Sequence, residues 1–157
     1  MATVADRSRV VTKREVEGRL RDWERRLREL FARVEQWSVA LWGDGCVTHG
    51  SIVPPLEYMM EEAGVSSRRL PTLTVQAGPR VISFEPRCLW IIGANGQIDV
   101  FVEGGPLSRQ PGVPHALFDM GREDGQPSDW QIRNRNPRKV LEPFTKEVLL
   151  RIASGRP

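Results

Sequence analysis

A regular stripe of apolar residues between positions 16 and 41 constrains this chain more than any other feature. The residues recur in alternating steps of four and three, the spacing of the core positions of a coiled coil, and so share one face of an α-helix. They are Val16, Leu20, Trp23, Leu27, Leu30, Val34, Trp37 and Leu41. Thr12 and Glu15 have the spacing of a capping box, and two glycines follow position 42. We therefore expect one helix over residues 12–42, preceded by a flexible N-terminus at residues 1–11.

The length of this helix predicts association with another molecule. About thirty helical residues span about 45 Å, which exceeds the diameter expected for the rest of the domain. Part of the stripe is then expected to lack an intramolecular partner and to meet a second chain as a coiled coil or docked helix. The predicted interface residues are Val16, Leu20, Trp23, Leu27, Leu30 and Val34. The alternative is that the stripe covers the sheet of its own chain, and Phe31 and Trp42 widen the apolar face in a way that favours packing on a sheet.

The middle of the chain has the pattern of an antiparallel meander. Short β-prone runs follow one another at the spacing expected for consecutive strands, with glycine and proline between them. The predicted strands are residues 72–76, 80–84, 89–92, 97–102 and 115–120, with 130–133 as a candidate edge strand. A short helix at 54–63 and a closing helix at 143–153 complete the pattern. The predicted fold class is α+β, with about five antiparallel strands flanked by three helices, in a single domain of residues 12–157.

The sequence around Asn95 and Gly96 predicts a tight hairpin. Asn-Gly is the preferred pair for a two-residue turn between antiparallel strands. The preceding run, residues 89–92, is Leu-Trp-Ile-Ile and is apolar at every position. Strands of that kind are covered on both faces. We expect residues 89–92 to form a central strand of the sheet.

Composition places the chain among globular proteins. Its 157 residues are 39% hydrophobic and 27% charged, and no apolar segment is long enough to cross a bilayer. The first ten residues do not resemble a secretory signal, and the two cysteines are too few for a disulfide framework. These features favour a cytoplasmic protein that does not interact with membranes.

The net charge of +3 hides a segregation along the chain. Residues 1–42 hold ten Lys and Arg against seven Asp and Glu, residues 43–129 hold six against eleven, and residues 130–157 hold seven against two. Basic ends and an acidic middle favour contacts within the molecule or between copies of it. The alternative is nucleic-acid binding by Arg133, Arg135, Arg138 and Lys139, with Trp130 stacking on a base.

Residues capable of catalysis or metal binding are present but poorly arranged. Cys46 and His49 form a C-x-x-H pair, which Cys88 and His115 could complete as a zinc site. Structural zinc sites usually take their ligands from two closely spaced pairs, whereas 26 residues separate Cys88 from His115. Asp44, Cys46 and His49 are too close in sequence to converge on one reaction centre. We expect no enzymatic activity, no metal and no cofactor.

Together these patterns predict a non-enzymatic, cytoplasmic interaction or assembly module. It would form a homodimer, or act as an adaptor, through its N-terminal helix, and contact a partner through its acidic sheet or the loops of that sheet. The alternative function is that of a nucleic-acid-associated accessory protein.

Overall fold

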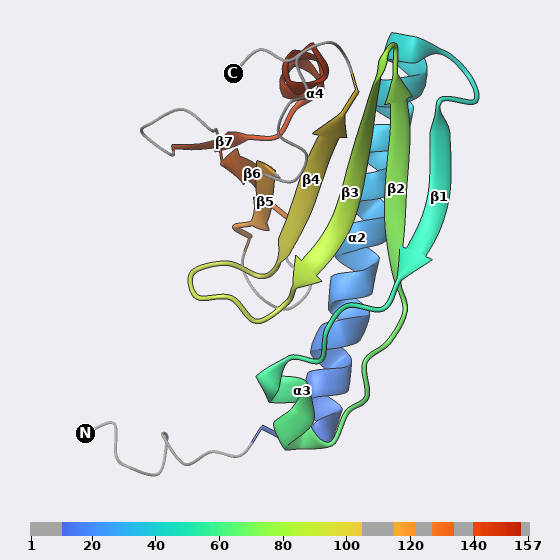
Figure 1. The fold of residues 1–157 in the computed structure, drawn as a ribbon. Helices are drawn as coiled ribbons and strands as arrows, with labels where there is room; N and C mark the ends of the chain where they lie inside the picture. Colours follow the sequence, from blue (N-terminus) through green and yellow to red (C-terminus); the bar gives the residue numbers. More distant parts are fainter. Residues whose placement is uncertain (1–10, 105–114, 122–126, 134–139, 155–157) are drawn as a thin grey trace.

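The computed structural model describes residues 11–104, 115–121, 127–133 and 140–154 (Figure 1). Its helices are α2 (Lys13–Trp42), α3 (Tyr58–Ala63) and α4 (Lys146–Ala153). Its strands are β1 (Val47–Ile52), β2 (Leu70–Ala77), β3 (Arg80–Cys88), β4 (Gln97–Glu103), β5 (His115–Asp119), β6 (Trp130–Arg133) and β7 (Leu141–Pro143). The predicted flexible segment, apart from Val11, lies outside the described residues.

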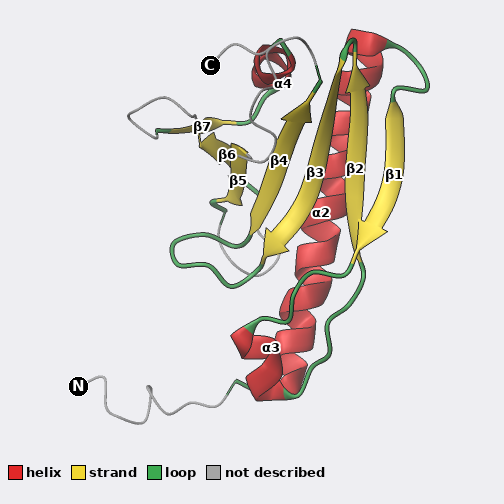
Figure 2. Ribbon diagram, in the orientation of Figure 1, coloured by secondary structure: helices red, strands yellow, loops and turns green. Residues whose placement is uncertain are grey.

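The seven strands form one antiparallel sheet in the order β1 to β7, a meander in which each strand pairs with its neighbours in sequence (Figure 2). The predicted α+β class is confirmed, but seven strands replace the expected five or so. The two edge strands were not predicted. β1 lacks an alternating apolar pattern because its middle four residues are exposed, and β7 is only three residues long. Neither leaves a periodic signal in the sequence.

Helix α2 begins and ends where the capping signals predict. The Thr12 hydroxyl accepts a hydrogen bond of 3.2 Å from the Glu15 amide. At the other end Gly43 adopts a φ of 93° and its amide donates to the Val39 carbonyl. Positive φ is readily available to glycine, so the helix ends there without strain.

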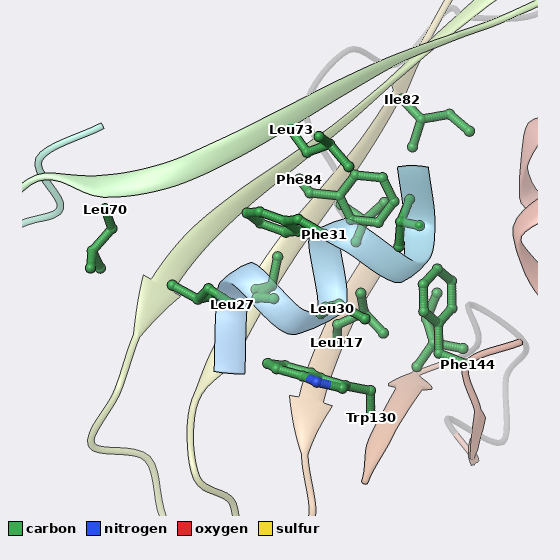
Figure 3. Close-up of a cluster of buried hydrophobic side chains, with 14 of the residues drawn as sticks. Leu27, Leu30, Phe31, Leu70, Leu73, Ile82, Phe84, Leu117, Trp130 and Phe144 are labelled. Atoms are coloured by element: carbon green, nitrogen blue, oxygen red, sulfur yellow. The ribbon is translucent and has the colours of Figure 1, made fainter. Parts of the chain in front are cut away.

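The apolar stripe of α2 lies in the core of its own chain. All six predicted interface residues are buried, with 0–3% of their surface exposed. The sheet curls around the helix, so that side chains on two sides of α2 meet strands (Figure 3). Phe31 points toward Leu73 and Phe84, with its ring centre 6.2 Å from that of Phe84, whereas Leu30 points toward Trp130. The expectation that this stripe outruns its own domain is therefore wrong, and these side chains offer no surface to another molecule.

The N-terminal half of α2 is covered by a different part of the chain. Thirty helical residues span about 45 Å, whereas the nine residues of β3 span about 30 Å, so the helix does extend past the strands. The segment between β1 and β2, which contains α3, fills the difference and packs beside the first turns of α2 (Figure 1). Met60 of α3 and Val65 join Val16 and Leu20 in one buried cluster. The helix is longer than the strands, but the expectation of an uncovered stripe was wrong because it overlooked this intervening segment.

Residues 89–92 are not a strand. β3 ends at Cys88, after a register irregularity at Pro86, and pairs with β4 from Val81 to Cys88. The two strands are antiparallel neighbours as predicted, but the connection between them is residues 89–96 instead of a two-residue turn. Ile92, expected in the middle of the sheet, is fully exposed. The Asn-Gly pair stands immediately before β4, where Gly96 has a φ of 127°.

The two shorter helices are confirmed with later starts than predicted. α3 begins at Tyr58 and is closed by Gly64 in the left-handed conformation. α4 begins at Lys146, where the Thr145 hydroxyl accepts from the Val148 amide, because the preceding residues form β7. Its apolar face, with Val148, Leu149 and Ile152, is buried in the common core.

Candidate functional site

The predicted nucleic-acid segment is described only at its first residue. Arg133 is exposed at the end of β6, with its guanidinium 4.9 Å from the centre of the Phe118 ring. Arg135, Arg138 and Lys139 lie outside the described residues. Trp130, proposed to stack on a base, is 5% exposed and packs against Trp23 with the ring centres 6.0 Å apart. It belongs to the core and has no face to offer a nucleotide.

The cysteine and histidine residues are distributed over several strands. Cys46 is buried just before β1, Cys88 ends β3 and His115 begins β5. In the sheet, β2 lies between β1 and β3, and β4 lies between β3 and β5. His49 points to α2, where its Nε2 lies 3.0 Å from Glu35 Oε2. Within the described ranges, no three His, Cys, Asp or Glu side chains gather as metal ligands would. Burial, and secondarily the charge of Glu57, raises the pKa of the Cys88 thiol, which makes it a poorer nucleophile.

The connection between β3 and β4 is the candidate site, and we call residues 89–95 the apolar loop. It contains Leu89, Trp90, Ile91 and Ile92 in succession, followed by glycine. Leu89 is 2% exposed and anchors the loop in the core, whereas Ile92 is completely exposed. An Ile91–Ala94 bridge folds the tip back on itself, with Gly93 at a φ of 85°. The loop thus presents aliphatic surface to water from a defined turn.

A partly buried carboxylate fixes the first half of this loop. The Glu57 carboxylate, just before α3, accepts hydrogen bonds of 2.9 and 3.1 Å from the Leu89 amide and one of 2.9 Å from the Trp90 amide. Charge-assisted bonds of this kind are among the stronger ones in proteins. On the other side, the Arg19 guanidinium of α2 lies 6.0 Å from the centre of the Trp90 ring, within cation–π range. Arg19 of α2 and the residue that precedes α3 therefore hold the loop where β3 ends.

The second half of the loop is fixed by a close approach to α2. A Cβ atom on Gly96 would lie 2.3 Å from the Trp23 ring, so only glycine fits there. The Asn95 amide donates to the Asp119 carbonyl at 2.7 Å, and the Asn95 side chain donates to the Gly121 carbonyl. The loop is thereby joined to the end of β5.

Asp119 itself is held by a buried ion pair. Arg26 and Asp119 are 1% and 0% exposed, and Arg26 Nη1 lies 2.6 Å from Asp119 Oδ2. The other oxygen of Asp119 accepts from the Gly121 and Asp129 amides, both at 3.0 Å. Arg26 Nε also donates to Asp22 Oδ2 at 2.7 Å. This network links α2 to β5 and to the strand connection that follows β5.

The electrostatics of the network follow from its pairing. Burial alone would lower the pKa of Arg26, but hydrogen bonds to Asp22 and Asp119 outweigh burial and raise it. Burial opposes ionisation of Asp22 as well, and hydrogen bonds from Arg25 and Arg26 overcome that effect and lower its pKa. The charged forms of Arg26 and Asp22 are therefore favoured.

The loop borders an open groove with a volume of about 480 Å³. Its lining consists of Arg19, Met59, Trp90, Ile91, Ile92, Gly93, Ala94, Asn95 and Gly121. Arg19 is the one charged residue among these nine. The volume is in the range of small-molecule sites, and the aliphatic walls suit an apolar group.

Sequence reasoning missed this site because it assigned residues 89–92 to a buried strand. The run of apolar residues was correctly noticed, but its exposure depends on the strand ending at Cys88. Glu57 and Arg19, which hold the loop, are distant in sequence and carry no pattern that connects them to it. Gly93, directly after the aliphatic run, was a local sign that the chain turns before Asn95 and Gly96.

Comparison with known proteins adds no assignment: no family model, curated protein or solved structure matches the chain. In the described part of the chain, no helix has the length and apolar character needed to cross a membrane.

Proposed function

We propose that the protein is a non-enzymatic interaction module that binds another protein through the apolar loop and its groove. The observation that carries the proposal is the combination of full exposure at Ile92 with fixed anchoring on both sides of the loop. Complete burial of an Ile side chain contributes about 1.5–3 kcal/mol, and a pre-ordered loop loses little conformational entropy on binding. The proposed partner segment carries an apolar side chain, which would pack on Ile92 and the aliphatic wall of the groove.

The test compares the chain with two surface variants. Ile92→Asp places a charge at the tip of the apolar loop, and Leu150→Asp places one on the outer face of α4, where Leu150 is 47% exposed. Tagged proteins are used to capture partners from the native host, followed by affinity measurement with the purified partner. We expect the wild type and Leu150→Asp to bind alike and Ile92→Asp to bind at least about tenfold more weakly. Equal affinity in all three would contradict the proposal.

Nucleic-acid binding is the alternative, and it is supported by the charge of residues 130–157, with seven basic against two acidic residues. Salt-dependent gel shifts with Arg135 and Arg138 changed to Ala test it. Binding through phosphates would weaken steeply as salt rises and would be reduced in the double variant. No shift at low salt would reject this alternative.

A further inference from the structure

Strand β1 leaves one edge of the sheet unpaired within the described part of the chain. The Gln76 amide donates to the Cys46 carbonyl at 2.7 Å, and hydrogen-bonded positions alternate along an antiparallel pair. Thr48, Gly50 and Ile52 therefore direct their main-chain groups toward β2. Val47, His49 and Ser51 direct their amides and carbonyls away from the sheet. This edge offers three donors and three acceptors in a row.

The edge also lacks the features that prevent strand pairing. Proteins block such edges with proline, charged side chains, bulges or very short strands. Residues 47–52 contain no proline, lysine, arginine or carboxylate, and they pair with β2 in unbroken register from Val47 to Ile52. The opposite edge differs, because β7 has three residues and ends at Pro143. Of the two edges, only β1 is long and regular enough to accept another strand.

We propose that a second copy of this chain pairs with β1, antiparallel and about a two-fold axis at His49. In this register His49 faces His49 of the second copy, and Val47 faces Ser51 of the second copy. The three outward residues on each strand then form about six main-chain hydrogen bonds. A two-fold axis perpendicular to the sheet keeps both copies of α2 on the same face. The result is one continuous sheet of doubled width.

Charge favours a second copy over an unrelated strand. Asp44 is exposed just before β1, whereas Arg69 lies at the other end of β1, where it donates to Ser51 Oγ at 3.1 Å. Antiparallel pairing brings the acidic end of each strand to the basic end of the other, so the arrangement is complementary to itself. At the axis each His49 retains its own Glu35, with Nε2 and Oε2 3.0 Å apart. The two imidazoles therefore approach with a carboxylate beside each.

This pairing surface is separate from the apolar loop, and its test is independent of the proposed function. His49→Pro removes an amide that points away from β2, so the β1–β2 pairing keeps its hydrogen bonds. His49→Ala is the matched control, because it removes the imidazole and retains the amide. Sedimentation of the full chain from about 1 to 300 μM, a span set to cover weak strand-mediated dimers, gives the dissociation constant. Thermal unfolding confirms that each variant is folded.

We expect a dimer in the wild type, in His49→Ala and in the loop variant Ile92→Asp. In His49→Pro the dissociation constant should rise at least about tenfold, because two hydrogen bonds are lost at the axis. Hydrogen exchange of the wild type supplies a check that needs no variant: the amides of Val47, His49 and Ser51 should become protected as concentration rises. A monomer throughout this range, or a dimer unaffected by proline, would overturn the proposal. So would equal loss in the alanine variant, or protection that requires an added foreign peptide.

Discussion

The buried pair of Arg26 and Asp119 allows the sharpest test of how the fold is held together. Arg26→Met retains most of the side-chain volume but leaves the Asp119 carboxylate, at 0% exposure, without the guanidinium that lies 2.6 Å away. Removing one member of a buried pair costs about 3–5 kcal/mol because the remaining charge is uncompensated. Total stabilities of domains are about 5–15 kcal/mol. The substitution should therefore remove a large part of the free energy of unfolding.

The opposite substitution should be milder. In Asp119→Asn the amide oxygen can still accept from the Gly121 and Asp129 amides, and Arg26 keeps its 2.7 Å contact with Asp22. In Arg26→Met, by contrast, Asp119 keeps its full charge at 0% exposure, and the two backbone amides that remain do not replace the guanidinium. The structure therefore predicts that Arg26→Met lowers the free energy of unfolding more than Asp119→Asn does. The double variant should lower it by less than the sum of the two single losses, since the double variant buries no unpaired charge.

Urea denaturation, followed by the fluorescence of the buried tryptophans Trp23 and Trp130, measures these differences. At about 2–4 °C per kcal/mol for a chain of this size, Arg26→Met should lower the melting temperature by about 6–20 °C. The coupling energy from the double-mutant cycle should be at least about 1 kcal/mol. A loss below about 1 kcal/mol in Arg26→Met, or additive single effects, would refute the view that the two charges depend on each other.

Three further predictions address Gly96 beside the loop, the charge of Asp22 and the Cys88 thiol. Gly96→Ala should destabilise the protein and change tryptophan fluorescence, because the added Cβ would lie 2.3 Å from the Trp23 ring. The control Gly78→Ala has no atom near the added Cβ and should cost only about 1 kcal/mol of backbone strain. Equal losses of stability for the two variants in chemical denaturation would contradict this prediction. The pKa of Asp22 is lowered in the folded state, so its contribution to stability is present above the unfolded-state pKa and is lost as pH falls through the folded-state pKa. The stability difference between wild type and Asp22→Asn should therefore shrink on acidification below 3.8, the ordinary pKa of an Asp side chain. A difference that grows in acid would contradict this. Because the pKa of the Cys88 thiol is raised, iodoacetamide should alkylate Cys88 at pH 7.5 more slowly than it alkylates a small free thiol. Mass spectrometry measures the two rates, and equal rates would disprove the prediction.

The periodic parts of the fold could be predicted from sequence because local patterns determine them. The four-three stripe and its capping residues gave α2 nearly to the residue, and the β-prone runs gave β2 to β6, although residues 89–92 were assigned to a strand that does not exist. The stripe could not reveal what covers it. A helix that lies under a curled sheet and a helix that meets a second chain have the same apolar spacing, and the choice depends on how far the sheet wraps.

The candidate site could not be predicted because its contacts join distant positions. Arg26 reads in the sequence as an ordinary surface partner of Asp22 four residues earlier, and that contact is present. Its burial and its contact with Asp119, 93 residues away, follow only from the curl of the sheet. The Glu57 contact with the Leu89 and Trp90 amides is similarly non-local, across 32 and 33 residues.

The buried ion pair and the exposed loop are parts of one arrangement. Asp119 binds Arg26 through its side chain, and its carbonyl accepts from the Asn95 amide at the end of the apolar loop. Buried ion pairs add little net stability compared with apolar replacements, so stability alone is a weak reason for this pair. What the pair does supply is a fixed position of β5 relative to α2. Helix α2 also bears Arg19, which contacts Trp90 of the loop, and Trp23, which lies close to Gly96 directly after the loop. A variant in which apolar residues replace both charges should therefore remain folded and yet hold Ile92 less firmly, and hydrogen exchange at the Asn95 amide would measure that loosening directly.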